Sequence, residues 1–271
     1  WPPTSDMNAG DAATVKNSGY SRELAMISWF GRVNYDYAGK YLFEANIRAD
    51  ASSRFAKGHR WGYFPSFSAA WRISEEAFME EAVGWLTDLK IRGSYGNLGN
   101  QSALSDFYPW MNSYDLDAHY SLNGSLQTGY HQKNYKIATI SWEKARTWGV
   151  GIDATLFGKL TVGLDYYDRK TTGIIMDVPV PAEFGLGAYK DNVGAMVNRG
   201  VELTLNYNES WDDWSFGVSA NLAYNKNKVL YLDGVQSLAD GDLKVKQVGA
   251  AYGTYRLYKT GGFFQSDEEA K

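Results

Sequence analysis

The sequence predicts an all-β fold that forms part of a large antiparallel transmembrane β-barrel. Segments in which apolar and polar residues alternate strictly recur along the chain, and this period of two is typical of strands with one apolar face. Short and long connectors alternate between these segments, as they do in outer-membrane barrels. Aromatic residues make up 15% of the chain, and Tyr and Trp favour the interfaces of a membrane. The mean hydropathy of −0.41 and the lack of a long apolar run argue against a transmembrane helix.

The clearest hairpin is predicted between residues 40 and 73. One parity of its first strand is apolar and consists of Tyr41, Phe43, Ala45, Ile47 and Ala49. The second strand repeats the pattern with Tyr63, Phe67, Ala69, Trp71 and Ile73. The polar connector between them is too long for a two-residue turn. A soluble β-sandwich would show the same alternation, so the hairpin alone does not separate the two classes.

The same alternation predicts further strands over residues 26–37, 87–96, 147–156, 160–169, 200–208 and 214–227. Two weaker strand candidates, 107–114 and 118–126, lie in a long polar region, and residues 173–198 are expected to form another long loop. Ser74, two acidic residues and an i, i+3, i+4 apolar set predict a short helix over residues 74–85 with Ser74 as its N-cap.

The predicted connectors differ in length at the two ends of the strands. Short turns are expected near residues 38, 158 and 212, and long loops near residues 56, 112, 184 and 233. In bacterial outer-membrane barrels the short turns are periplasmic and the long loops extracellular. The polar parity should then face the lumen, where Gly149, Gly151 and Gly163 are expected to leave room for a molecule inside.

No catalytic, cofactor-binding or metal-ligating residue is predicted, and the chain is not expected to be an enzyme. Cysteine is absent, which excludes disulfides and thiolate chemistry. The histidines at 59, 119 and 131 lie in predicted loops without metal-ligand spacing. The acidic run at 75–81 fits a solvated helix face better than a catalytic pair. A net charge of −4 without a basic face argues against nucleic acid as a partner.

Aromatic residues in the long polar region are the candidate contacts for a ligand or partner. They are Tyr108, Trp110, Tyr114 and Tyr120. Aromatic faces stack on sugar rings, but an interface girdle or packing within the loop would use the same residues. Arg54, Phe55 and Trp61 are expected to tie the first long loop to the rim as a charged-aromatic clamp.

Charged residues on the lumenal parity have two interpretations. They are Arg48, Arg72, Arg92, Asp153, Asp165 and Arg169. They could touch a plug or a cargo, or they could form ion-pair ladders along the inner wall. The sequence leaves both open.

Six motifs follow one another along the chain: YDYAGKYLFEANIRADASSRF, RWGYFPSFSAAWRISEEAF, LKIRGSYGNLGNQ, WEKARTWGVGIDATLF, LDYYDRKTTGIIMDVPVP and NVGAMVNRGVELTLNYN. In this order they resemble the SusC/RagA family of TonB-dependent outer-membrane transporters of Bacteroidetes. The resemblance runs from about residue 27 to residue 259. It implies a barrel of about 22 strands, of which this chain would be the middle to late part.

The resemblance also implies partners and a task. These are a SusD-like surface lipoprotein, energy coupling through TonB, contact with outer-membrane lipid, and import of a glycan, peptide or similar nutrient. Residues 1–24 and 261–271 are expected to be loop and 25–260 to be strands and extracellular loops. The chain is therefore expected to be an internal section of the barrel, without the plug or the closing strands.

Two alternatives remain at this point. A TonB-dependent siderophore or vitamin receptor would have the same barrel but no lipoprotein partner. A secreted all-β carbohydrate-binding or hydrolytic protein would need a second sheet to bury the apolar rows, and it would be soluble without detergent.

Overall fold

The computed structural model describes residues 21–82, 84–233, 237–239 and 243–259, together with residues 241, 262 and 268. Most of the two predicted terminal loops, 1–24 and 261–271, lies outside these residues. No helix in the described part of the chain is both long and apolar enough to cross a membrane.

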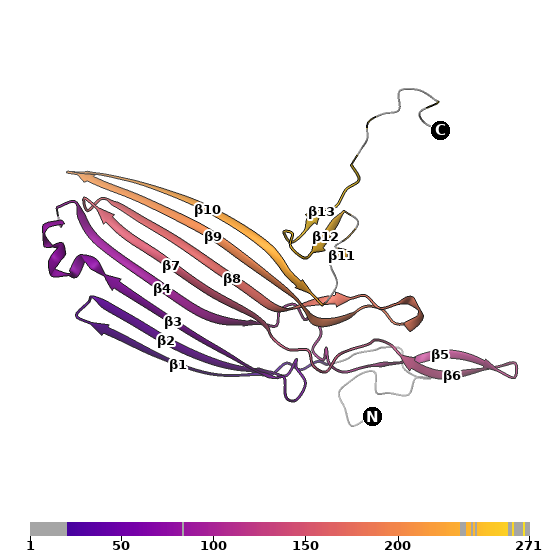
Figure 1. Ribbon diagram of the computed structural model, residues 1–271. Helices are drawn as coiled ribbons and strands as arrows, with labels where there is room; N and C mark the ends of the chain where they lie inside the picture. The colour runs from indigo at the N-terminus through magenta and orange to yellow at the C-terminus, as the bar shows by residue number, and fades with distance from the viewer. Residues whose placement is uncertain are drawn as a thin grey trace.

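Eight long strands form one antiparallel sheet in the order β1-β2-β3-β4-β7-β8-β9-β10 (Figure 1). The strands are β1 (Met26–Tyr37), β2 (Tyr41–Ser52), β3 (Trp61–Arg72), β4 (Leu86–Asn100), β7 (Glu143–Leu156), β8 (Leu160–Val178), β9 (Tyr189–Trp211) and β10 (Trp214–Leu232). Short strands β11 (Ser237–Ala239), β12 (Lys244–Gln247) and β13 (Thr254–Tyr255) form a separate small sheet. Each long strand pairs with its neighbours in an up-and-down order, so the predicted all-β barrel wall is confirmed.

The predicted short turns join β1 to β2, β7 to β8 and β9 to β10 at one end of the sheet (Figure 1). Ala38 and Gly39 have φ of 54° and 67°, and Phe157 and Gly158 have φ of 54° and 67°. Two successive positive φ angles are typical of the type I′ turn, whose twist matches that of the strands it joins. Both turns therefore continue the sheet without a break.

At the opposite end, the strands extend further than the sequence predicted. β8 and β9 remain paired as far as Val178 and Tyr189, so the connector expected over 173–198 shortens to 179–188. Gly173, with φ of 63°, lies at the register shift that allows pairing to continue. Beyond it, a buried apolar cluster stabilises the extended strands and contains Met176, Val193, Val229 and Leu232.

The strand predictions inside the long polar region were wrong in their boundaries. Residues 107–113 form no strand, and Pro109 lacks the backbone donor that a ladder needs. The candidate at 118–126 spans a turn at Asn123 and Gly124, with φ of 50° and 73°. The observed hairpin consists of β5 (Tyr114–Leu122) and β6 (Ser125–Gln132), and it projects beyond the wall (Figure 1). His119 and His131 therefore lie on strands, not in loops.

The helix predicted over 74–85 is instead two short 3-10 segments, η2 (Ile73–Glu75) and η3 (Ala77–Ala82). Ser74 does not act as an N-cap. Its hydroxyl donates to Asp88 Oδ1 at 3.0 Å, and Arg72 precedes the first segment without a side-chain cap. The side-chain oxygen of an N-cap accepts a hydrogen bond from a backbone N–H of the first helical turn. The Ser74 hydroxyl instead donates to Asp88 on β4.

The main hydrophobic core lies at the rim that carries the long loops. It consists of Phe55, Phe64, Leu104, Ile140, Trp142 and Ile175. Phe55 is fully buried and its ring lies 5.1 Å from that of Trp142. The predicted clamp is thus only partly correct. Arg54 stacks over Phe107 at 5.7 Å, whereas Trp61 is 46% exposed.

Candidate functional site

The register of the sheet separates an apolar outer face from a polar inner face. Across β4, β7, β8 and β9, the outer face carries one continuous row formed by Ile91, Ile152, Leu164 and Leu203. Val150, Ile152 and Leu164 are 52%, 44% and 44% exposed, so the described residues supply no second sheet over them. An exposed apolar surface of this extent indicates contact with lipid rather than with water.

Aromatic pairs mark two levels on the outer face. Near the short turns, Tyr41 and Trp71 stack at 6.4 Å between ring centroids. Towards the long loops, the rings of Trp148 and Tyr166 lie 5.5 Å apart. Aliphatic rows lie between the two levels, which is the girdle pattern of a barrel wall in a bilayer.

The inner face holds a charge network centred on Arg92. Its Nε donates to Asp153 Oδ2 at 2.9 Å, and its Nη2 donates to Asp165 Oδ2 at 2.7 Å. Lys90 Nζ approaches Asp153 Oδ2 at 3.0 Å. One guanidinium thereby joins β4 to β7 and β8. Because its donors lie in a planar fork, it can satisfy two carboxylates at once.

Gly151 provides the space for this network. A Cβ at Gly151 would stand 2.5 Å from Asp165 Oδ1 and 2.8 Å from Arg92 Cζ. The expectation that lumenal glycines leave open room is therefore wrong at this position, because the protein's own charged side chains fill the space. At Gly163 a Cβ would meet nothing closer than 3.7 Å, which is ordinary van der Waals contact, so a small side chain would fit there.

Other charges on the inner wall are also paired along the sheet. Arg48 Nε contacts Asp50 Oδ2 at 2.7 Å, and Arg72 Nη2 contacts Glu75 at 3.2 Å and Asp88 at 3.4 Å. Five of the six lumenal charges singled out in the sequence thus belong to ion-pair ladders. The exception is Arg169, which has no carboxylate partner among the described residues.

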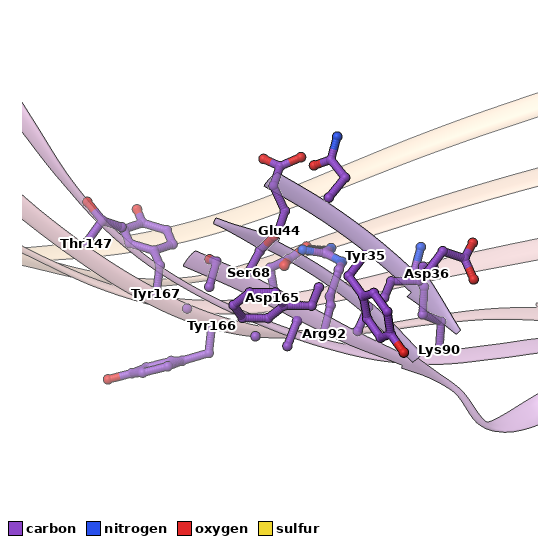
Figure 2. Close-up of a pocket in the computed structure, with 18 of the residues that line it drawn as sticks. Tyr35, Asp36, Glu44, Ser68, Lys90, Arg92, Thr147, Asp165, Tyr166 and Tyr167 are labelled. Atoms are coloured by element: carbon purple, nitrogen blue, oxygen red, sulfur yellow. Dashed lines mark hydrogen bonds and ion pairs between the residues drawn. The ribbon is translucent and has the colours of Figure 1, made fainter. Parts of the chain in front are cut away.

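A hollow of about 850 Å³ opens on this inner face. Figure 2 shows Arg92, Ser68 and Asp165 in its middle, between Tyr167 and Thr147 on one side and Asp36 and Lys90 on the other. Its lining includes acids, bases and hydroxyls, and Tyr167 adds an aromatic face. This lining can donate and accept hydrogen bonds without fixing one ligand shape, which suits passage or docking rather than covalent chemistry.

Glu76 anchors the segment between β3 and β4 to the wall, a role that sequence reasoning missed. It accepts hydrogen bonds from the Tyr41 hydroxyl at 2.6 Å and from Trp71 Nε1 at 3.1 Å. Lys40 Nζ lies 3.2 Å away. These donors, the Tyr41 hydroxyl first, lower the pKa of the Glu76 carboxyl below its ordinary value. Tyr41 and Trp71 are register partners on β2 and β3. Both were in the predicted hairpin, so their pairing could have indicated that a polar group lies near their donors.

The four aromatic candidates fall into two environments. Trp110 packs against the buried rim core, and Tyr108 is half-buried beside it in the same loop. Tyr114 and Tyr120 lie on β5 and are 58% and 66% exposed. Tyr130, which the sequence analysis did not single out, pairs edge-to-face with Tyr114 at 5.9 Å. The structure therefore does not bring the four together, and it places an exposed tyrosine pair on the projecting hairpin.

The long loops are fixed to the sheet by two polar side chains, the half-buried Asn192 and the buried Glu143. Asn192 accepts from the Ser141 backbone N–H at 2.8 Å and donates to the Ser141 and Gly173 carbonyls at 3.0 and 2.7 Å. Glu143, which is 7% exposed, accepts from the Ile175 backbone N–H at 2.9 Å. These bonds hold the base of the loop that carries β5 and β6.

The described residues contain no group of three or more His, Cys, Asp or Glu side chains that could hold a metal ion. Within those residues the ion pairs join Arg or Lys to carboxylates, and those of Arg92 link neighbouring strands. The inner wall therefore offers recognition surfaces built from charge and aromatic rings.

The family model described as "TonB dependent receptor-like, beta-barrel" matches residues 2–267. The chain is 34% identical over 229 residues to the TonB-dependent receptor SusC of Bacteroides thetaiotaomicron, covering 83% of the chain and 23% of that protein. It is 34% identical over 274 residues to TonB-dependent receptor P26 of Formosa agariphila, covering 97% of the chain and 27% of that protein. The chain thus spans about a quarter of the length of these relatives.

Solved structures give the same placement. A structure titled as the RagAB peptide importer in the closed-closed state matches 86% of this chain and 25% of that chain, with a TM-score of 0.75 and 27% identity. The FrpB iron transporter of Neisseria meningitidis matches 79% of this chain and 28% of that chain, with a TM-score of 0.50, and at 12% identity it shows the fold alone. The sheet order, the two faces and these likenesses agree that the chain belongs to the TonB-dependent receptor β-barrel family of the bacterial outer membrane and is of the SusC/RagA type.

Proposed function

We propose that this chain forms part of the wall and outer loops of a nutrient importer of the bacterial outer membrane. The single observation that carries the proposal is the polar hollow of about 850 Å³ on the inner face of a wall whose outer face is apolar. A wall built this way separates a hydrated passage from lipid. Its similarity to SusC and RagA supports transport rather than catalysis.

The importer works with a SusD-like surface lipoprotein and is energised through TonB. The support is the likeness to structures titled RagAB peptide importer and to SusC. The cargo is a glycan, a peptide or a similar nutrient, because the inner wall presents both charges and hydroxyls with an aromatic face at Tyr167. A siderophore or vitamin receptor without a lipoprotein is the competing function, and no feature of the described wall favours it.

The secreted carbohydrate-binding alternative conflicts with the outer face. That alternative requires the rows around Val150 and Ile152 to be buried under a second sheet. In the part of the chain that the structure describes, these residues are 52% and 44% exposed and no other strand covers them.

Uptake by whole cells tests the proposal. A strain lacking the full-length protein and its complemented parent receive one pool of oligosaccharides and oligopeptides, and mass spectrometry follows what leaves the medium. We expect the complemented strain alone to deplete one class, and a protonophore to abolish that depletion. Identical depletion by both strains would contradict an import function for the protein.

The exposed tyrosines of the β5–β6 hairpin allow the same uptake assay to test single residues. Tyr114 and Tyr120 are proposed to contact the cargo or the lipoprotein, since exposed aromatic faces are typical of binding anchors. Tyr114→Ala with Tyr120→Ala should reduce uptake and leave the unfolding temperature of the barrel unchanged. Trp110→Ala is the matched contrast, because Trp110 packs on the rim core and its loss should lower stability.

A further inference from the structure

Three basic side chains, Lys144, Arg146 and Lys170, lie together on the outer face near the long-loop rim. Arg146 and Lys170 are register partners on β7 and β8, and Lys144 is the next outward residue of β7. Together with Tyr63 and Thr172, they line a shallow cavity of about 310 Å³. We call these three side chains the basic patch.

The basic patch has no anionic partner within the described residues, since none of its three side chains makes an ion pair there. Lysines near the short turns, in contrast, have carboxylate partners. Lys40 lies 3.2 Å from Glu76, and Lys159 lies 2.6 Å from Glu209. Clustered cations repel one another unless an anion lies between them. Asp168, the next outward residue of β8 after Lys170, is paired with Arg199 at 2.6 Å. The basic patch is therefore left without a carboxylate of its own, which points to an anion from outside the chain.

The position of the basic patch defines where that anion comes from. On the outer face of β7, the aromatic level at Trp148 separates the basic patch from the aliphatic residues Val150 and Ile152. Residues just beyond the aromatic girdle lie among lipid headgroups. β7 and β8 are flanked by β4 and β9, so this surface is not a sheet edge.

A second feature of the same face fits the rest of a lipid. A groove of about 510 Å³ lies towards the short turns and is lined by Ala69, Gly93, Val150 and Ile91 among others. Ala69 and Gly93 are register partners on β3 and β4. Two small residues side by side leave a trough between larger apolar neighbours, which an acyl chain can occupy.

We propose that the basic patch binds the phosphates of a lipid that carries more than one phosphate on its headgroup, the class that includes diphosphorylated lipid A. The Arg146 guanidinium can take one phosphate in a bidentate manner, and the two ammonium groups act as point charges. The acyl chains then follow the apolar groove. The lipid thereby fixes the height of the wall in the outer leaflet.

The test uses the full-length protein purified in detergent and measures lipid adducts by native mass spectrometry. The probes are diphosphoryl lipid A and the same lipid without its phosphates. The variant Lys144→Gln, Arg146→Gln, Lys170→Gln should bind the phosphorylated lipid more weakly, by about fivefold for each removed charge at low salt. Binding of the dephosphorylated lipid should be weak in both proteins and unaffected by the substitutions.

Arg169→Gln is the matched control. It removes one charge from the same strand, next to Lys170, but on the inner face. Lys170→Gln should weaken lipid binding and Arg169→Gln should not. This pair also serves if the triple variant fails to fold, which heat-modifiable migration on gels reveals.

Two results would overturn the proposal. One is equal retention of diphosphoryl lipid A by the wild type and the Lys170→Gln protein. The other is full displacement of the lipid by inorganic pyrophosphate at an equal concentration, which would show a site for a free anion. Neither result depends on cargo uptake, so the proposed import function stands or falls separately.

Discussion

At the scale of single residues, the inner wall depends on the missing side chain at Gly151, because Arg92 lies over this glycine and binds two carboxylates there. The sequence predicted that Gly151 and the charges around it face the lumen. It did not predict that Arg92 lies over Gly151 between two carboxylates. That arrangement depends on a register across β4, β7 and β8, which alternation within one strand does not determine.

The glycine gives a direct test. Gly151→Ala should destabilise the barrel by about 1–3 kcal/mol, because the new Cβ overlaps the Arg92 and Asp165 side chains. Gly163→Ala is the matched control, since its Cβ meets nothing closer than 3.7 Å and alanine restricts the unfolded chain. Thermal unfolding of the full-length protein in detergent measures both. A Gly151→Ala protein as stable as the Gly163→Ala protein would refute the packing described for Arg92.

Glu76 gives a prediction about pH. Its carboxyl has a lowered pKa in the folded state, mainly because the Tyr41 hydroxyl donates to it. A lowered folded pKa stabilises the protein above the unfolded pKa of about 4.3, and this stabilisation is lost as the pH falls through the folded pKa. Glu76→Gln should therefore lower the unfolding temperature at pH 7 and have a smaller effect near pH 3.

The control for this experiment is Glu81→Gln, an exposed acid in the same segment. It should leave the unfolding temperature unchanged at both pH values. A Glu76→Gln effect of the same size at both pH values would show that the carboxylate's charge is not what anchors the segment.

At the scale of elements, the sequence predicted the strands within the membrane band much better than those beyond it. Period-two alternation holds where one face meets lipid and the other meets a polar lumen. Beyond the band, as in the paired stretch of β8 and β9 around Ile175 and Val193, both faces pack in the rim core and the alternation disappears. The dipeptide Asn123-Gly124 is a common signal for a two-residue hairpin turn, and it lies inside the strand predicted over 118–126.

The loop carrying that hairpin should loosen when its anchor is removed. Asn192→Ala deletes the hydrogen bonds to Ser141 and Gly173 and leaves half-buried backbone groups without these partners, at a cost of about 1 kcal/mol each. We expect faster tryptic cleavage within residues 101–142 on intact cells. Asn198→Ala, on the same strand, has no such contacts in the described structure and should leave the cleavage rate unchanged. Equal rates would show that Asn192 does not hold the loop.

At the scale of the whole molecule, we predict that one face of β7 meets lipid and the other meets water, and this can be tested without knowing the cargo. This section of the wall contains no cysteine, so single cysteines introduced into it can carry spin labels in the full-length protein in lipid bilayers, after any cysteine elsewhere in that protein is replaced. Labels at Val150 and Ile152 should be accessible to oxygen, and a label at Asp153 to a water-soluble nickel reagent. A profile without this alternation would contradict the assignment of the faces.

In the candidate site, the sequence predicted the environment of each residue but not the contacts between side chains. The type of each residue indicated polar lumen or aromatic loop, but not which side chains meet. Tyr114 and Tyr130 are separated by the hairpin turn, and only the pairing of β5 with β6 brings their rings to 5.9 Å. Trp110 and Tyr120 are both aromatic residues of the same long polar region, so the sequence does not distinguish them. Trp110 packs against the rim core, whereas Tyr120 is exposed on β5.

The most direct test of the central claim is to purify the tagged full-length protein from its membrane in detergent and identify what accompanies it by mass spectrometry. The proposed importer predicts a SusD-like lipoprotein in near-equal amount, retained through washing. A protein that purifies alone would contradict the lipoprotein-coupled importer, and one that stays soluble without detergent would contradict the membrane wall itself.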